Sequence, residues 1–162
     1  DVYKRQEKYA VSESTAMKPE IVEWHENAFT MTDALGLCSR ATLSTYAILP
    51  EDMAAMYETA TGIPMTTEEL TEASRRIVLL ERFFNMREGV RREADTLPWR
   101  LMHEPLERPH NQGTSMNSKE EMDGMLDRYY ELRGWDKNGL PTRETVEHYG
   151  LEDIINEEDF YK

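Results

Sequence analysis

The residues best suited to chemistry lie close together, in Asp33-Ala34-Leu35-Gly36-Leu37-Cys38. Cys38 is the single cysteine of the sequence, and thiolates bind soft metals and iron–sulfur clusters. Asp33 offers a carboxylate acceptor for N–H donors, and Gly36 permits a close backbone approach to a neighbouring group. Two interpretations stay open from the residues alone. We favour a buried, inert thiol, the usual fate of a lone cysteine; the other is one ligand of a cluster completed from elsewhere.

Other ligand patterns fail in their spacing. Asp136-Lys137-Asn138-Gly139 resembles part of a calcium loop, but Pro141 stands where that loop has its glycine, so a plain turn is expected. No glycine-rich phosphate loop and no nucleophile elbow occurs. The four histidines show no metal-binding spacing and are expected to be surface or packing residues: His25, His103, His110 and His148.

Charge and composition disfavour several classes of partner. The 162 residues carry 19 Lys+Arg against 32 Asp+Glu, a formal net charge of −13, and 39% of them are hydrophobic. Such an acidic chain repels nucleic acid and anionic membrane surfaces. No apolar run approaches the roughly 18–20 residues of a membrane span. We expect a soluble, cytoplasmic protein without an internal disulfide framework, because it has one cysteine.

Apolar spacing and capping residues predict a mostly α fold. A short helix is expected over Lys18–Phe29, with Ile21, Val22 and His25 on neighbouring turns, followed by a loop-like or helix-terminal stretch over 30–40 that carries Asp33. Pro50 begins a second helix that Gly62 ends. The stretch between them is compatible with either extended or helical structure.

The later helices have clearer boundaries. Thr66 and Glu69 form a capping box before a long helix that ends near Gly89. Its expected apolar stripe is Leu70, Ala73, Ile77, Leu80 and Phe84, widened by Val78, Leu79 and Phe83. Ser118 caps a further helix that Gly134 stops, and Thr142 caps a last short one. The expected apolar side chains of the Ser118 helix and its exit are Met122, Met125, Leu126, Tyr129, Tyr130, Leu132 and Trp135, with the aromatic ones in the core rather than in a stacking platform.

Three motifs, taken in order, resemble the C-terminal helical part of the tungsten-dependent aldehyde ferredoxin oxidoreductases. The first is Asp-x-x-Gly-Leu-Cys at Asp33–Cys38. The second is Glu81–Gly89 followed by Asp95–Pro98, and the third is Met125–Asp136 followed by Gly139–Thr142. The resemblance extends over about Lys18 to Leu151. It implies a mostly α, irregular helical domain that belongs to the C-terminal part of that fold.

The resemblance also implies an activity and its cofactors. Members of this family oxidise aldehydes to carboxylic acids at tungsten (sometimes molybdenum) held by two pterins, and a 4Fe–4S cluster passes the electrons to ferredoxin. Asp33 matches the position that hydrogen-bonds a pterin, Leu37 matches a position whose backbone meets it, and Cys38 matches the fourth cluster ligand. The other three cluster cysteines and the catalytic acid and base of the family have no match here. This chain alone is therefore expected to be inactive, with its missing N-terminal part, ferredoxin and the aldehyde as partners.

Four parts are expected along the chain. Residues 1–16 form an N-terminal segment whose first six residues resemble translated adapter sequence, and the absence of a methionine before Met17 favours a truncated gene. Residues 17–103 form the helical, cofactor-facing domain with the Asp33–Cys38 motif. Residues 104–117 form a loop excursion, and 118–162 form the C-terminal helical segment and its acidic tail.

Two alternatives remain. One is another enzyme of the same family, the tungsten subunit of an acyl-CoA reductase. The other is a cofactor-free helical interaction domain, which would have a start methionine close upstream and would tolerate replacement of Cys38.

Overall fold

The computed structural model of the chain describes residues 17–107, 114–115 and 118–155. The expected N-terminal segment 1–16, most of the loop tip including His110, and the end of the acidic tail lie outside these residues. The described part is mostly helical, as expected, and its strands are two residues long. Among the described residues, no helix combines the length and the apolar character that crossing a membrane requires.

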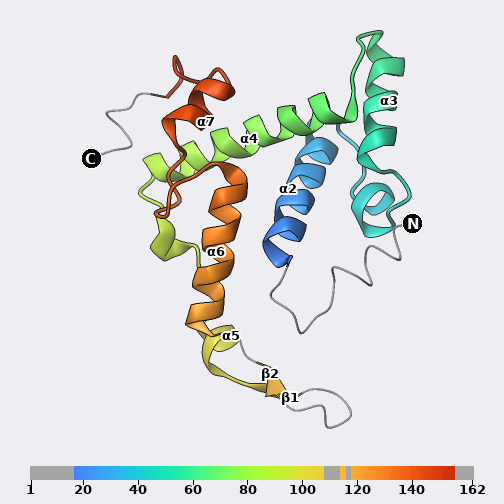
Figure 1. The fold of residues 1–162 in the computed structure, drawn as a ribbon. Coiled ribbons are helices and arrows are strands. Elements are labelled where there is room, and N and C mark those ends of the chain that lie inside the picture. Colours follow the sequence, from blue (N-terminus) through green and yellow to red (C-terminus); the bar gives the residue numbers. More distant parts are fainter. Residues whose placement is uncertain (1–16, 108–113, 116–117, 156–162) are drawn as a thin grey trace.

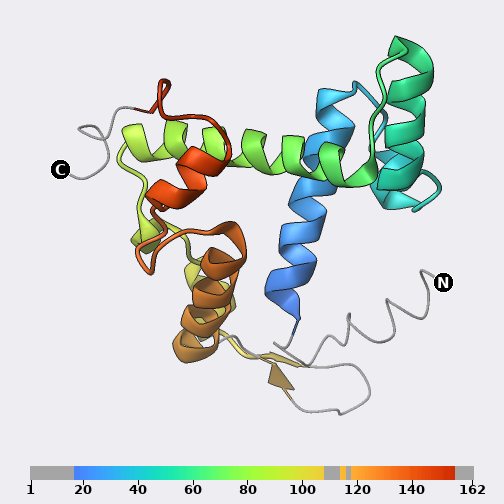
Figure 2. The same cartoon turned by 45° about the horizontal axis from the view of Figure 1, so that its top comes forward.

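The helices gather around one long central helix, α4, which spans Thr67–Arg87 (Figure 1). Helix α2, Lys18–Ala34, and helix α6, Lys119–Arg133, both lie on one side of α4. Helix α3, Pro50–Thr61, packs near the start of α4, and the short α7, Arg143–His148, packs near its end (Figure 2).

Short elements connect these helices. A π-helical turn, η1, spans Arg40–Ser44, and a 3₁₀ turn, η2, spans Arg92–Ala94. Helix α5, Trp99–His103, leads into the strands β1, Leu106–Glu107, and β2, Thr114–Ser115. These strands pair antiparallel, with Leu106 opposite Ser115, at the place of the expected loop excursion.

The helix ends follow the predicted capping signals. Thr66 and Ser118 each complete a capping box before α4 and α6, and the Thr142 hydroxyl accepts the Thr145 N–H at the start of α7. Gly62 and Gly134 take the left-handed conformation after α3 and α6, with φ of 72° and 68°. Such caps depend on a few neighbouring residues, so the local sequence predicts them well.

The long central helix buries part of the predicted stripe: Leu70, Val78, Leu79 and Phe83 are buried as expected, but other predicted positions are not. Its buried residues are Leu70, Ser74, Val78, Leu79, Arg82, Phe83 and Met86. Phe84, assigned to the core stripe, is instead 63% exposed, and Ala73 is exposed as well. The prediction ranked side chains by polarity and therefore missed Ser74 and Arg82, whose polar groups are satisfied. The Ser74 hydroxyl donates to the Thr71 carbonyl of the same helix, whereas Arg82 has partners outside it. Arg82 donates to both carboxylate oxygens of Asp95 and to the Gly139 carbonyl.

Helix α2 departs from the prediction in length and in orientation. It continues to Ala34, five residues beyond the expected end, so that Asp33 lies in its last turn. Ile21, Val22 and His25, expected on neighbouring turns, are not among its buried residues, and Val22 is 47% exposed. The residues that α2 buries are Pro19, Glu23, Asn27, Ala28, Met31 and Thr32.

Within the described residues, two apolar clusters stabilise the arrangement. The larger lies at the C-terminal half of α4 and contains Tyr130 and Trp135, which confirms that these aromatic residues belong to the core. The smaller cluster joins α2, α3 and the start of α4 through Met31, Met53, Ala54 and Leu70. Leu35 and Leu37 of the candidate site pack against this smaller cluster.

Candidate cofactor-binding site

The Asp33–Cys38 motif forms the C-terminal cap of α2. The Leu37 N–H donates to the Thr32 carbonyl at 2.9 Å, and the Gly36 N–H donates to the Asp33 carbonyl at 3.1 Å. This pair of bonds, with Gly36 at φ +67°, is a Schellman motif. The glycine is therefore required for its left-handed backbone. A Cβ added there would meet no described atom within 4 Å, so close approach to another described group is not its role.

Side chains of the motif alternate between the core and the surface. Leu35 and Leu37 are half-buried against the smaller apolar cluster, whereas Asp33 and Cys38 are exposed. The expectation from the residues alone that this thiol is buried was therefore wrong in this chain. The leucines anchor the turn, and this leaves the carboxylate and the thiol accessible from outside.

The groups that face outward have no partners within the described residues. No described residue donates to the Asp33 carboxylate or to the Leu37 carbonyl, and none is hydrogen-bonded to the Cys38 thiol. A carboxylate and a carbonyl suit a heterocycle rich in N–H groups, and a thiol suits an iron–sulfur cluster. The residues present thus fit the pterin and the cluster that the resemblance implies.

The turn after Cys38 is also well fixed. The Cys38 carbonyl accepts from the Ala41 and Thr42 N–H groups, at 3.0 and 3.2 Å, which starts η1. The loop beyond η1 returns to α2, where the Tyr46 hydroxyl lies 3.1 Å from His25 Nε2. His25 is therefore a packing residue here, as predicted.

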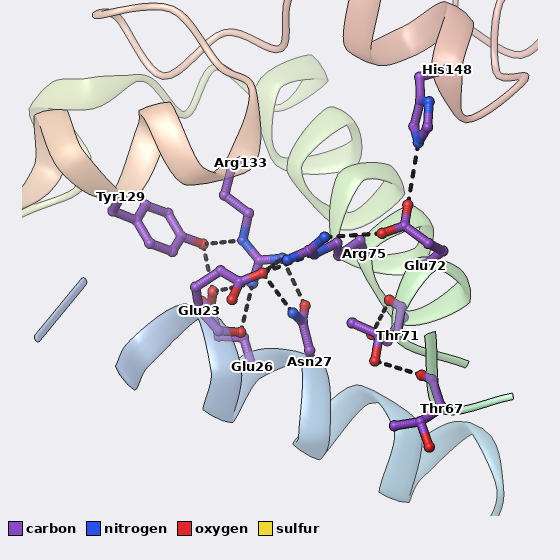
Figure 3. A network of polar contacts seen from close by, with 11 residues as sticks. Glu23, Glu26, Asn27, Thr67, Thr71, Glu72, Arg75, Tyr129, Arg133 and His148 are labelled. Atoms are coloured by element: carbon purple, nitrogen blue, oxygen red, sulfur yellow. Dashed lines mark hydrogen bonds and ion pairs between the residues drawn. The ribbon is translucent and has the colours of Figure 1, made fainter. Parts of the chain in front are cut away.

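A buried polar network holds α2 against α4 and α6 (Figure 3). Arg133 of α6 donates to Asn27 Oδ1 at 2.8 Å and to Glu26 Oε2 at 2.7 Å. Glu23 accepts from Asn27 at 2.7 Å and from Arg75 of α4 at 2.9 Å. These groups satisfy one another, so the network acts as a structural clamp that sets the position of α2.

The network continues outward to α7. Glu72 lies 2.9 Å from Arg75 and 3.2 Å from the exposed His148. Burial alone would raise the pKa of Glu72, but hydrogen bonds from His148 and Arg75 outweigh it and lower the pKa. Burial, together with the negative charge of Glu72, raises the pKa of Tyr149 to about 12.

The second and third motifs pack together near the other half of α2. Asp95, which is paired with Arg82, also accepts a hydrogen bond from the Tyr130 hydroxyl. These contacts connect α4, its exit loop and α6. The second and third motifs line a groove of about 560 Å³ whose walls include Val22, Met125, Leu126 and Leu97.

The Asp136–Gly139 segment is a turn, as predicted: the Asp136 carboxylate accepts the N–H groups of Asn138 and Leu140. No group of acidic, histidine or cysteine side chains in the described part could hold a metal ion by itself.

Sequence reasoning missed two residues behind the motif. Thr32 and Thr42 are fully buried, and their hydroxyl oxygens lie 3.1 Å apart. Neither residue has a signal in the sequence, because ten positions separate them and only the folded turn brings them together.

Comparisons of this chain with known proteins agree on one family. The family model for "Aldehyde ferredoxin oxidoreductase, domains 2 & 3" matches residues 2–151. A tungsten-containing aldehyde ferredoxin oxidoreductase from Pyrococcus abyssi is 34% identical over 139 residues, which are 85% of this chain and 22% of that protein. The corresponding protein of Thermococcus kodakarensis is 35% identical over 126 residues, 77% of this chain and 20% of that protein.

A solved structure extends the likeness to the fold. It is the active-site complex BamBC of benzoyl coenzyme A reductase with 1,5-dienoyl-CoA, with a TM-score of 0.68 and 28% identity. The likeness covers 88% of this chain and 20% of that one, so the chain spans about a fifth of the length of the relatives that it matches. The family model covers most of the chain and the relatives share its sequence, so this chain belongs to the aldehyde ferredoxin oxidoreductase family, in the region of its domains 2 and 3.

Proposed function

We propose that this chain forms one side of a tungsten- (or molybdenum-) bis-pterin site and supplies one ligand of a 4Fe–4S cluster. Asp33 and Leu37 bind the pterin, and Cys38 binds the cluster. The observation that carries the proposal is the Schellman turn that leaves the Asp33 carboxylate and the Cys38 thiol exposed and without partners in the described residues. Membership of a family whose curated relatives contain tungsten supports it.

Each of these groups has a defined task. The Asp33 carboxylate accepts hydrogen bonds from pterin N–H groups, and such charge-assisted bonds are about twice as strong as neutral ones. The Leu37 carbonyl accepts a further N–H. Cys38 donates thiolate sulfur to iron, and hydrogen bonds near that sulfur influence the potential of the cluster.

The whole polypeptide, in this proposal, oxidises an aldehyde. The metal centre and cluster supply the redox chemistry, in which aldehyde and water give carboxylic acid, two protons and two electrons, which pass to ferredoxin. The remaining three cluster ligands and the general acid and base come from the rest of the polypeptide, because this chain spans 22% of the length of a curated relative. The reducing cytoplasm is the compartment that suits an exposed thiol and such a cluster.

Asp33→Asn in the polypeptide that carries this chain, purified without oxygen, tests the pterin contact. Losing one charge-assisted bond costs about 1.5–3 kcal/mol, so we expect at least a tenfold faster loss of pterin and tungsten during dialysis. Asp153→Asn is the matched control, because Asp153 is also exposed. Equal retention of both groups in the two variants would refute the assignment of Asp33.

A second candidate activity is the reduction of an aromatic acyl-CoA. The likeness to the benzoyl coenzyme A reductase complex favours it. Both candidates give Asp33 and Cys38 the same tasks and differ in the substrate. An assay of the purified polypeptide with aldehydes and an oxidised dye, and in parallel with benzoyl-CoA and a reduced dye, separates them. Turnover of the aldehyde alone supports the first candidate, and turnover of the thioester alone supports the second.

A further inference from the structure

A pair of buried threonines lies directly behind the exposed motif. Thr32, in the last turn of α2, and Thr42, in η1, are both 0% exposed. Their hydroxyl oxygens are 3.1 Å apart, although the residues belong to different elements. Buried hydroxyl groups are retained where they are hydrogen-bonded, so this pair makes a specific link between α2 and the turn that follows it.

The pair connects both ends of the motif. The Thr32 carbonyl accepts the Leu37 N–H at 2.9 Å, which closes the Schellman motif. The Thr42 N–H donates to the Cys38 carbonyl at 3.2 Å, and the Thr42 hydroxyl approaches the same carbonyl at 3.4 Å. The two threonines therefore fix the peptide groups on each side of the Leu37–Cys38 step.

The protons available limit how the pair bonds. Thr32 Oγ1 also lies 2.8 Å from the Ala28 carbonyl. The acceptors around the pair are therefore the Ala28 carbonyl, the Cys38 carbonyl and the oxygen of the partner hydroxyl, and the two hydroxyls have two protons to donate to them. Replacing Thr42 by valine leaves the Thr32 hydroxyl bonded to Ala28 and the Cys38 carbonyl bonded to two N–H groups. The substitution thus leaves no buried donor unpaired, and it removes the link while preserving volume.

We propose that Thr32 and Thr42 are positioning residues for the Cys38 thiolate. This inference rests on the proposed function of Cys38 as a cluster ligand. The hydroxyl pair holds the Cys38 peptide in one orientation, so that the thiolate is presented to iron without first ordering the turn. Neither threonine touches the cluster, and they act through the backbone of the motif.

The test is the rate at which cluster iron passes to a chelator, measured in the anaerobically purified polypeptide that carries this chain. We expect Thr42→Val to release iron at least threefold faster than the parent, with a broadened electron paramagnetic resonance signal of the reduced cluster. Thr42→Ser, which restores the hydroxyl, should release iron at the parental rate. Because the two hydroxyls act as one link, Thr32→Val/Thr42→Val should be no faster than the faster single variant.

Two controls separate positioning from general loss of stability. Thr45 follows η1, and its exposed hydroxyl donates to the Arg40 and Ala41 carbonyls. The Thr45→Val variant should release iron at the parental rate. Val146→Ala removes methyl groups from the other apolar cluster and lowers stability away from the motif. Release by Thr42→Val at the rate of Val146→Ala, or additive effects of the two threonines, would overturn the inference. A Cys38→Ala variant that keeps its full iron content would instead refute the proposed function, and the inference with it.

Discussion

Replacing Arg133 tests whether the buried network sets the position of α2. The Arg133 side chain is 3% exposed and bonds to Asn27 and Glu26, with Glu23 3.8 Å away. Arg133→Met keeps much of the apolar stem and removes the charge. Breaking a buried pair costs about 3–5 kcal/mol, because the partner charge stays buried.

The surroundings place the expected cost at the lower end of that range. Glu23 keeps its bond from Arg75, and the Glu26 side chain is 41% exposed, so water partly replaces Arg133 there. We expect a loss of about 3 kcal/mol in the free energy of unfolding, and a Tm lower by about 6–12 °C for a chain of this size.

Urea unfolding of the 162-residue chain, followed by circular dichroism, measures this loss. Arg128→Met is the matched control on the same helix, because Arg128 is 46% exposed and pairs with Glu20 and Glu131 at the surface. Surface pairs contribute about 0–1 kcal/mol, so the control should lose no more than about 1 kcal/mol. Equal losses in the two variants would refute the view that the Arg133 network is a structural clamp.

Four further substitutions have outcomes that follow from local geometry. Gly139→Ala should cost about 3 kcal/mol, because a Cβ there would clash with the Arg82 guanidinium and the Tyr130 ring, and φ is +74°. Gly36→Ala should lower the free energy of unfolding by about 1 kcal/mol, because only its positive φ opposes a side chain there. Equal losses for Gly139→Ala and Gly36→Ala in urea unfolding would contradict this account. Thr66→Ala should cost about 1 kcal/mol through loss of the α4 cap, and an unchanged urea midpoint would contradict it. Folding raises the pKa of Tyr149 from about 10 in the unfolded chain to about 12. The contribution of the neutral Tyr149 to stability is therefore fully present below about pH 10, and it is lost as the pH rises to 12. Tyr149→Phe should therefore flatten the fall of the urea midpoint over that range, and an equally steep fall would refute the assignment.

The local sequence predicted helix boundaries better than buried faces. The caps at Thr66, Ser118 and Thr142 depend on residues three positions apart, and each was confirmed. The buried faces of α2 and α4 depend on partners that lie far along the chain. Glu23 and Arg82 are buried because Arg75 and Asp95 satisfy them, and apolar periodicity does not register such pairs.

The candidate site shows a similar division. The residues of the Asp33–Cys38 motif and their resemblance to the family pointed to Asp33, Leu37 and Cys38. Their roles in binding the pterin and the cluster are proposals. The sequence left open whether the motif lies in a loop or at a helix end, and it did not predict that Gly36 caps α2 or that the thiol is exposed. The Thr32–Thr42 contact was also beyond prediction, because a hydroxyl pair needs the folded turn to bring its members together.

Iron content is the most direct measure of the central claim, that Cys38 is a cluster ligand. The polypeptide that carries this chain is purified without oxygen as Cys38→Ala and as Ser39→Ala, a control at the neighbouring exposed position. The account predicts that Cys38→Ala loses most of its iron and acid-labile sulfide and that Ser39→Ala keeps both. Full iron and sulfide in Cys38→Ala would contradict the account, and would leave the exposed thiol without a part in cofactor binding.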